Sequence, residues 1–305
     1  MLLWNVFTQV LLPILVMFGA GWLLDRRCRL DLGSLVKMNI YLFVPSFIFV
    51  QIVRSNLTAT LALRVVGFTV AIFAGMFVLS ALVGWLMGYP RAQTRSLQLS
   101  TMFYNSGNYG VPLMALAFPT LGPVLQVFII VATNVSTFSV GLLLASSAHR
   151  TGWRMLLPML RQVSLWAVGA ALVVRVLHIP VQQWRWLWVP LDYFSNALIG
   201  LALVTLGAQI SKTERPQHLS RLGWALGLRL LGGPLLAWAL VGFFGFTGET
   251  AKIMILSSSF PTAVNTALIA HEFDADPHFA ASAVFCSTLL SMVTVTVLIS
   301  ILHLV

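Results

Sequence analysis

Two short runs of amide, hydroxyl, glycine and proline residues interrupt apolar stretches of the chain. The first run is NSGNYGVP at residues 105–112, and the second is SSSFPTAVN at residues 257–265. A proline removes a backbone donor and clashes with the carbonyl one turn earlier, while Gly107 and Gly110 weaken helix continuity further. Each run therefore predicts an interrupted helix, with an ordinary proline kink as the alternative interpretation.

Interrupted helices are suited to binding rather than to catalysis. The start of a half-helix has free N–H groups and a partial positive charge, which suit a carboxylate, while unwound carbonyls can coordinate a cation. Unpaired backbone groups are too costly in hydrocarbon, so the two interruptions are expected to face each other inside the protein. The expected substrate site consists of Asn105, Ser106, Asn108, Tyr109, Gly110, Pro112, Pro261, Thr262 and Asn265.

The three asparagines are the strongest candidates among these residues. An amide facing lipid would lack hydrogen-bond partners, so these side chains are expected to point inward and to contact substrate or its water. Hydrogen bonding between helices is the alternative role. Tyr109, Ser106 and Thr262 are weaker candidates, because small polar residues also allow helices to pack closely.

A second set of polar residues follows each interruption at a comparable distance. These residues could support the interrupted helices or offer oxygen ligands to sodium, and helix packing explains them about as well. They are Asn134, Thr137, Ser287, Thr288 and Ser291.

Charged residues are rare within the apolar stretches. No Asp or Glu falls at the centre of a predicted span, so a buried carboxylate that carries protons is not evident. Arg229 lies about two turns into a predicted span, within snorkelling reach of the inner surface. Two roles are open for Arg229, namely attraction of an anion from the cytoplasm and structural anchoring of its helix.

The motifs of common enzymes and metal sites are missing from this pattern. A group of histidines and acidic residues at 271–278 has the spacing of neither a zinc-protease helix nor an EF-hand loop, and we expect no metal there. No Ser-His-Asp set and no paired membrane carboxylates are visible, so we expect no catalytic residues and no enzyme activity.

The composition indicates that the protein is embedded in a lipid membrane. The 305 residues are 59% hydrophobic and 9% charged, with a mean hydropathy of +0.92, which is more apolar surface than a soluble core can bury. Apolar stretches of roughly 18 residues or more recur along the chain. They predict an all-α integral membrane protein with ten spans, near 5–24, 35–53, 62–87, 97–117, 123–147, 160–178, 188–210, 222–245, 251–271 and 279–303.

The net charge of +10 reflects orientation in the membrane rather than binding of nucleic acid. Loops on one side hold 12 of the 18 basic residues, and only five lie on the other side. Since Lys and Arg resist translocation, both termini are expected on the outer side. The twelve are Arg26, Arg27, Arg29, Lys37, Arg91, Arg95, Arg150, Arg154, Arg161, Lys212, Arg215 and Arg221.

The positions of the interruptions indicate an internal repeat. Pro112 and Pro261 are 149 positions apart, which is close to half of the 305 residues. We therefore expect one five-helix unit at residues 1–152 and a second at residues 153–305. Five is an odd number, so the second unit would be inserted upside down.

Four stretches, in their order and spacing, resemble the auxin efflux carrier family. They are YLFVPSFIF (41–49), FYNSGNYGVPL (103–113), LVTLGAQI (203–210) and FPTAVNTALIAHEFDAD (260–276), the last followed by STLLS (287–291). The likeness is to the bacterial type, which is related to the plant PIN-FORMED carriers and to the bile-acid/sodium symporter superfamily. Gly200 departs from the pattern, because many relatives carry a proline there.

The resemblance implies a specific architecture. The fourth and ninth helices would be broken and cross at mid-membrane, where the substrate carboxylate binds. Helices 1, 2, 6 and 7 would form a scaffold that dimerises, and helices 3–5 and 8–10 a moving transport bundle. Asn105, Pro112, Pro261 and Asn265 match the motifs of the two broken helices. The short segment 147–161 leaves no room for the long cytoplasmic loop of many plant carriers.

The resemblance also implies a function. It is secondary transport of a small organic anion, such as a dicarboxylate or an auxin-like carboxylate, by alternating access in a bacterial inner membrane. Export is expected by family analogy, without a cofactor, and coupling to protons or sodium is open. A sodium-coupled symporter and a ligand sensor without net flux are the alternatives.

Overall fold

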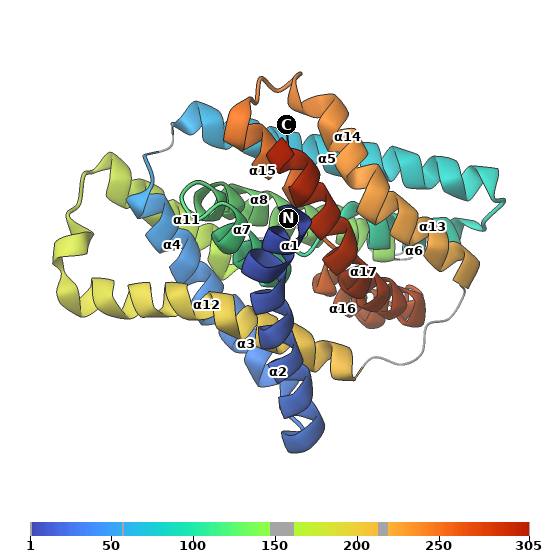
Figure 1. Ribbon diagram of the computed structural model, residues 1–305, viewed down its shortest axis with the longest axis horizontal. Helices are drawn as coiled ribbons and strands as arrows, with labels where there is room; N and C mark the ends of the chain where they lie inside the picture. The colour runs from blue at the N-terminus through green and yellow to red at the C-terminus, as the bar shows by residue number, and fades with distance from the viewer. Residues whose placement is uncertain (1, 57, 147–161, 213–218, 305) are drawn as a thin grey trace.

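Helices make up the computed structural model of the protein (Figure 1). The structure describes residues 2–56, 58–146, 162–212 and 219–304. Within these ranges there is no strand, and extended backbone pairs at one isolated bridge. The prediction of an all-α protein is confirmed for the described part of the chain.

The first half of the chain contains α-helices and short π-helical turns that continue them. They are α1 (Leu2–Val6), η1 (Phe7–Leu11), α2 (Leu12–Cys28), α3 (Leu32–Met38), η2 (Asn39–Phe43), α4 (Val44–Arg54), α5 (Ala59–Leu86), α6 (Arg91–Met102), η3 (Ser106–Gly110), α7 (Val111–Ala117), α8 (Gly122–Ser136), η4 (Thr137–Gly141) and α9 (Leu142–Ala145).

The second half follows a similar pattern. Its elements are α11 (Val163–Val176), the 3-10 turn η6 (Val181–Gln183), α12 (Arg185–Ser211), α13 (Leu219–Gly227), η7 (Leu228–Gly232), α14 (Gly233–Val241), α15 (Gly248–Ser257), α16 (Val264–Glu272) and α17 (Pro277–Leu304).

Seven helices in the described ranges are long and apolar enough to cross a membrane, and Val163–Val176 is a shorter apolar helix. A multi-pass membrane protein is therefore supported. The predicted spans at 97–117 and 251–271 are instead divided, into α6 and η3–α7 and into α15 and α16, because their interruptions break the helix. The count of ten spans in two inverted units stays a prediction.

The π-helical turns explain how prolines enter the long helices. Among the described residues, four of the five π-helical turns end two residues before a proline, at Pro13, Pro45, Pro112 and Pro234. A proline ring clashes with the carbonyl one turn earlier, and a wider turn moves that carbonyl away. These prolines therefore sit in continuous helical segments.

The position of the first interruption differs from the prediction. Backbone leaves the helix at residues 103–105, and Gly107, Gly110 and Pro112 lie in the continuous piece η3–α7 that follows. The reason is the wide turn before Pro112, which absorbs the ring without a break. In the second interruption the non-helical residues are 258–263, which include Pro261 as predicted.

Two groups of helices surround the interruptions. In the first, α12 packs against α2 and α4, and α4 packs against α11. In the second, α5 packs against α6, α8 and α14, and α17 packs against α13 and α16. Figure 1 shows α7 and α8 near the centre, between α12 on one side and α5 on the other.

The contact between α2 and α12 is unusually close. A Cβ atom added to Gly21 would clash with the backbone of Val204, and one added to Gly207 would clash with the backbone of Phe18. Each glycine thus lets the facing helix approach its backbone directly, as small residues do between membrane helices.

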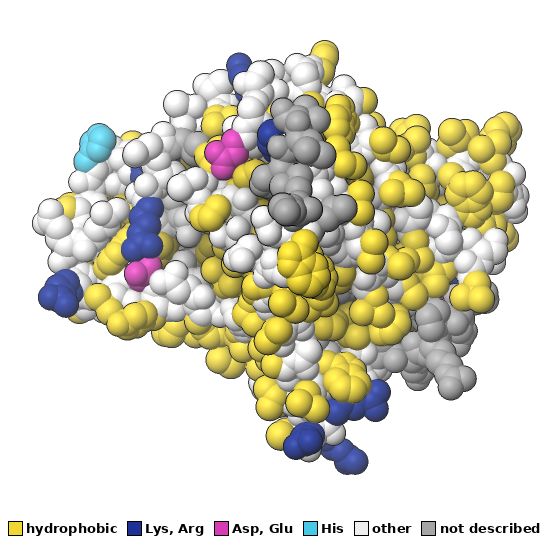
Figure 2. All heavy atoms as spheres, viewed as in Figure 1, with side chains coloured by type: hydrophobic (Ala, Val, Ile, Leu, Met, Phe, Trp, Pro, Cys, Tyr) yellow, Lys and Arg dark blue, Asp and Glu magenta, His cyan; other side chains and the backbone are white. Residues whose placement is uncertain are grey.

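The outer surface is rich in large apolar side chains. Trp85, Trp186 and Phe243 have exposed fractions of 76%, 75% and 86%, which is consistent with contact to lipid. In Figure 2 hydrophobic side chains cover much of the visible face, and a cluster of Lys and Arg marks the free end of α2. That end carries Arg26 and Arg27 in the last turn.

Some predictions fall outside the described residues. The predicted loop 147–161, with Arg150, Arg154 and Arg161, the boundary between residues 152 and 153, and Arg215 all lie in segments that the structure does not describe. They remain predictions.

Candidate functional site

The two interruptions meet, as the cost of unpaired backbone in lipid predicts. Tyr104 and Thr262 form an antiparallel bridge. The N–H of Asn105 donates to the carbonyl of Pro261 at 2.8 Å, and the N–H of Ala263 donates to the carbonyl of Phe103 at 3.0 Å. Each unwound segment therefore supplies backbone partners that the other has lost. This paired region, residues 103–105 with 261–263, is called the crossing below.

Hydrogen bonds between side chains and backbone connect the crossing to the neighbouring helices. The N–H of Thr262 donates to Ser287 Oγ at 3.0 Å, and Thr262 Oγ1 donates to the carbonyl of Ser100 at 2.8 Å. Gln126 of α8 donates from Nε2 to the carbonyl of Ser106 at 2.6 Å. The crossing is thus fastened to α6, α8 and α17.

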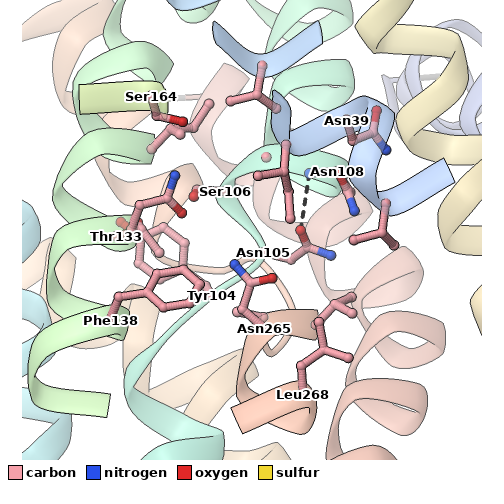
Figure 3. Close-up of a pocket in the computed structure, with 18 of the residues that line it drawn as sticks. Asn39, Tyr104, Asn105, Ser106, Asn108, Thr133, Phe138, Ser164, Asn265 and Leu268 are labelled. Carbon is pink, nitrogen blue, oxygen red and sulfur yellow. Dashed lines mark hydrogen bonds between the residues drawn. The ribbon is translucent and has the colours of Figure 1, made fainter. Parts of the chain in front are cut away.

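A cavity of about 100 Å³ lies beside the crossing, which is room for a few water molecules. In Figure 3 Asn105 and Asn265 lie close together inside it, with Asn39 and Asn108 on one side and Thr133 and Phe138 on the other. The polar side chains of its lining are Asn39, Tyr104, Asn105, Ser106, Asn108, Thr133, Asn134, Gln162, Ser164, Gln209 and Asn265.

Asn105 presents a hydrogen-bond donor at the crossing. Its Oδ1 accepts a hydrogen bond from the N–H of Asn108 at 3.1 Å, which fixes the direction of the carboxamide (dashed in Figure 3). Its Nδ2 is buried and has no hydrogen-bond partner among the described residues. A buried donor without a partner is costly, so an acceptor from a bound solute would be favourable here.

Helix α16 also opens onto the cavity without a cap. Its N-cap residue is Ala263, which has no side-chain acceptor, and no side chain caps the first turn. Val264 and Asn265 of this first turn line the cavity. The N–H groups at the start of a helix suit an anion, so this end of α16 could bind a carboxylate.

No described residue that lines the cavity carries a formal charge. Arg229 lies behind the lining, with its guanidinium 5.2 Å from the ring centroid of Tyr104. Its side chain is completely buried. Arg229 therefore does not extend to the inner surface, although that surface is within its reach, because the carbonyls of Thr101 and Ser258 accept its hydrogen bonds inside the protein.

The predicted substrate residues divide into two sets. Asn105, Ser106, Asn108 and Asn265 line the cavity. The others are buried in or next to the crossing and do not line the cavity. They are Tyr109, Gly110, Pro112, Pro261 and Thr262. A role in binding substrate stays a prediction for both sets.

The predicted supporting residues also have different environments. Asn134 lines the cavity, and Ser287 accepts the hydrogen bond from Thr262. The hydroxyls of Thr288 and Ser291 donate to carbonyls of their own helix, at Val284 and Thr288, both at 2.7 Å. Thr137 is buried.

Several polar residues of the lining were not predicted. Asn39, Gln162, Ser164 and Gln209 come from η2, from the residue before α11, from α11 and from α12. Asn39 and Gln209 lie in predicted apolar spans, so the cost of an amide in lipid, which identified Asn105, could have identified them too.

The group at 271–278 takes part in an ion pair between helices. Asp276 pairs with Arg221 of α13, and the Arg221 guanidinium lies 4.0 Å from the ring centroid of Phe279. Asp276 therefore has a charge partner in the protein.

Comparison with known proteins gives two similarities. Residues 165–299 match a family described as membrane transport protein. Over 294 residues the chain is 27% identical to an uncharacterized transporter from Methanothermobacter thermautotrophicus, and the match covers 94% of this chain and 95% of that protein. The second similarity therefore includes both halves of the crossing.

Proposed function

The chain belongs to the membrane transport protein family, that of the auxin efflux carriers, and on this premise we propose that it exports a small organic anion. It is a multi-pass membrane transporter and not an enzyme. The proposed substrate is a dicarboxylate or an auxin-like carboxylate, and the proposed location is the bacterial inner membrane.

The observation that carries the proposal is the cavity at the crossing. The first turns of two helical pieces line this cavity. Gly107 and Asn108 come from η3, and Val264 and Asn265 come from α16. Partial positive charge gathers at such helix starts, and the first turn of α16 has no side-chain cap, so its N–H groups can bind an acceptor from a solute. The Asn105 Nδ2 adds a donor whose partner is missing among the described residues.

The charges around the cavity favour binding of an anion and also allow its release. The described lining contains neutral donors, and the buried Arg229 lies one aromatic ring behind it. A positive charge in a low-dielectric interior attracts an anion more strongly than in water. Without a direct ion pair, the anion would still be free to dissociate on the far side.

Alternating access is the proposed mechanism. The cavity is lined by η2, α11 and α12, which belong to the first group of helices, the proposed scaffold, and by η3, α8 and α16, which belong to the second group, the proposed moving bundle. Motion of the second group past the first would expose one site to the cytoplasm and then to the outside. Two inverted five-helix units, a homodimer through the first group and both termini on the outer side belong to this proposal.

Flux through reconstituted vesicles tests the proposal. We expect saturable transport of at least one of labelled malonate, malate and an indole-type auxin by the wild-type protein. Asn105→Ala and Asn265→Ala should abolish this flux while leaving the thermal unfolding midpoint close to that of wild type. Normal flux in both variants would remove these side chains from the site.

Binding measured in detergent separates a transporter from a sensor. Wild-type protein that binds one of these acids but moves none of them would be a ligand sensor, and the transport half of the proposal would fail. Absence of both binding and flux for all three acids would reject the substrate class.

A further inference from the structure

Arg229 is buried at the ends of the interrupted helices without an acidic partner. Its Nη1 donates to the carbonyl of Thr101 at 2.7 Å and to that of Met102 at 3.3 Å. Its Nη2 donates to the carbonyl of Ser258. None of the ion pairs formed by the described residues includes Arg229. Backbone carbonyls therefore provide its hydrogen-bond acceptors in the described structure.

These carbonyls belong to the C-terminal ends of two helices. Thr101 and Met102 close α6, and Ser258 directly follows the last residue of α15. The last carbonyls of a helix lack intrahelical partners and carry partial negative charge. In transporters with interrupted helices, such carbonyls can coordinate a coupling cation. Here the guanidinium of Arg229 donates hydrogen bonds to carbonyls at both helix ends.

The surroundings leave room for this guanidinium. Gly233 lies one turn after Arg229, and a Cβ atom there would clash with Arg229 Nη2 and lie 2.5 Å from the Ser258 carbonyl oxygen. At the neighbouring Gly232 the nearest atom to a Cβ would be 3.7 Å away, which is an ordinary contact. The two glycines therefore form a matched pair for experiment.

We propose that Arg229 is a resident cation, which fills the carbonyl site at the ends of α6 and α15 and takes the place of a coupling sodium ion. The inference rests on the proposed transport function. A guanidinium that is part of the chain is not released on either side of a membrane, so a sodium gradient cannot drive transport through this site. Its positive charge also repels a second cation in the low-dielectric interior.

Thermal unfolding of the substrate-free protein tests the inference. Wild-type protein should unfold at the same midpoint, to within about 1 °C, in sodium chloride and in choline chloride of equal ionic strength. Arg229→Ala should unfold at a lower midpoint in choline chloride. Millimolar guanidinium or sodium should raise the midpoint of this variant by at least about 3 °C, because either cation can enter the emptied site.

Two results would overturn the inference. One is a rise of several degrees in the wild-type midpoint on addition of sodium, and the other is an Arg229→Ala variant that neither cation stabilises. If Arg229→Ala does not fold, Gly233→Ala takes its place, since its methyl group would crowd both the guanidinium and the Ser258 carbonyl. Gly233→Ala should then unfold at a lower midpoint than wild type without gaining stabilisation by sodium, because the charge of Arg229 is still present, and Gly232→Ala should behave as wild type. A Gly233→Ala protein that sodium stabilises by several degrees, or one with the midpoint of Gly232→Ala, would contradict the inference. No substrate is present in these measurements, so they do not depend on the proposed substrate class.

Discussion

Gly110 and Phe260 touch where the two interrupted helices pack together. A Cβ atom on Gly110 would lie 2.5 Å from Phe260 Cε2 and 2.5 Å from Gln126 Nε2. Phe260 in turn packs against Tyr104 and Tyr109, with ring centroids 5.9 Å and 5.7 Å away. A glycine is therefore required at this position for the aromatic residues to close around the crossing.

Gly110→Ala is expected to destabilise the protein by about 1–3 kcal/mol, because the added methyl group overpacks this contact. Gly107→Ala is the matched control, since a Cβ atom there meets nothing within 4 Å. Gly107 lines the cavity, so this control should change anion affinity with little change in the unfolding midpoint. Equal midpoints for the two variants would contradict the packing described for Gly110.

Gly207→Ala is expected to separate α2 from α12. Its methyl group would clash with the backbone of Phe18, which has no flexible atoms that can move away. We expect a loss of about 3 kcal/mol or more, at the upper end of overpacking costs. Gly200→Ala on the same helix is the control, because a Cβ atom there meets nothing within 4 Å. Thermal unfolding in detergent measures both, and a stable Gly207→Ala protein would show that α2 and α12 can separate freely.

Asn105→Asp tests the sign of the charge that the cavity accepts. The carboxylate keeps an oxygen for the N–H of Asn108, but it replaces the free Nδ2 donor by a negative charge. Repulsion should weaken binding of a carboxylate at least about tenfold, which corresponds to about 1.4 kcal/mol. Asn196→Asp, at an exposed position on α12, should leave binding unchanged. Tighter binding of the acid by Asn105→Asp would argue against an anion site.

Two ion pairs should differ in their contribution to stability. Arg221 is buried, and its Nε and Nη1 have no hydrogen-bond partner among the described residues, so Asp276→Asn leaves a buried charge unpaired. This should cost about 3 kcal/mol. The pair of Arg54 with Asp192 at 2.9 Å is more exposed, and Asp192→Asn should cost less than about 1 kcal/mol. A comparison of thermal midpoints would contradict this ranking if the second variant lost more stability.

The sequence was sufficient to predict that two helices are interrupted and to identify two of the amides beside the interruptions. Asn105 and Asn265 stand within apolar stretches, where a polar side chain is costly unless protein surrounds it. That cost acts on each residue separately, so a single sequence reveals it. The same cost explains why the two interruptions had to meet.

The start of the first interruption could not be predicted in the same way. Phe103 and Tyr104 are aromatic residues without any local signal for unwinding, and they leave the helix because Thr262 and Ala263 offer backbone partners. These partners come from the other half of the chain. Gly107, Gly110 and Pro112 predicted the interruption at the wrong residues, because the wide turn η3 accommodates the proline without a break in the helix.

The depth of Arg229 was also hidden from the sequence. Counting turns from the end of its helix places the residue about two turns into the span, within reach of the surface, but the acceptors that hold it inside belong to Thr101 and Ser258, at the ends of α6 and α15. The direction of a long basic side chain depends on where its hydrogen-bond acceptors lie, and the positions of these acceptors are set by the packing of other helices.

The main-chain bridge between Tyr104 and Thr262 has a consequence for the energetics of a transport cycle. Hydrogen bonds between peptide groups join both halves of the crossing, so neither half can shift without carrying the other. The part of the binding site that the crossing supplies should then keep the same geometry whichever face of the bilayer it opens to. Equal affinity on both faces would leave the solute gradient and the membrane potential to decide which way net flow runs.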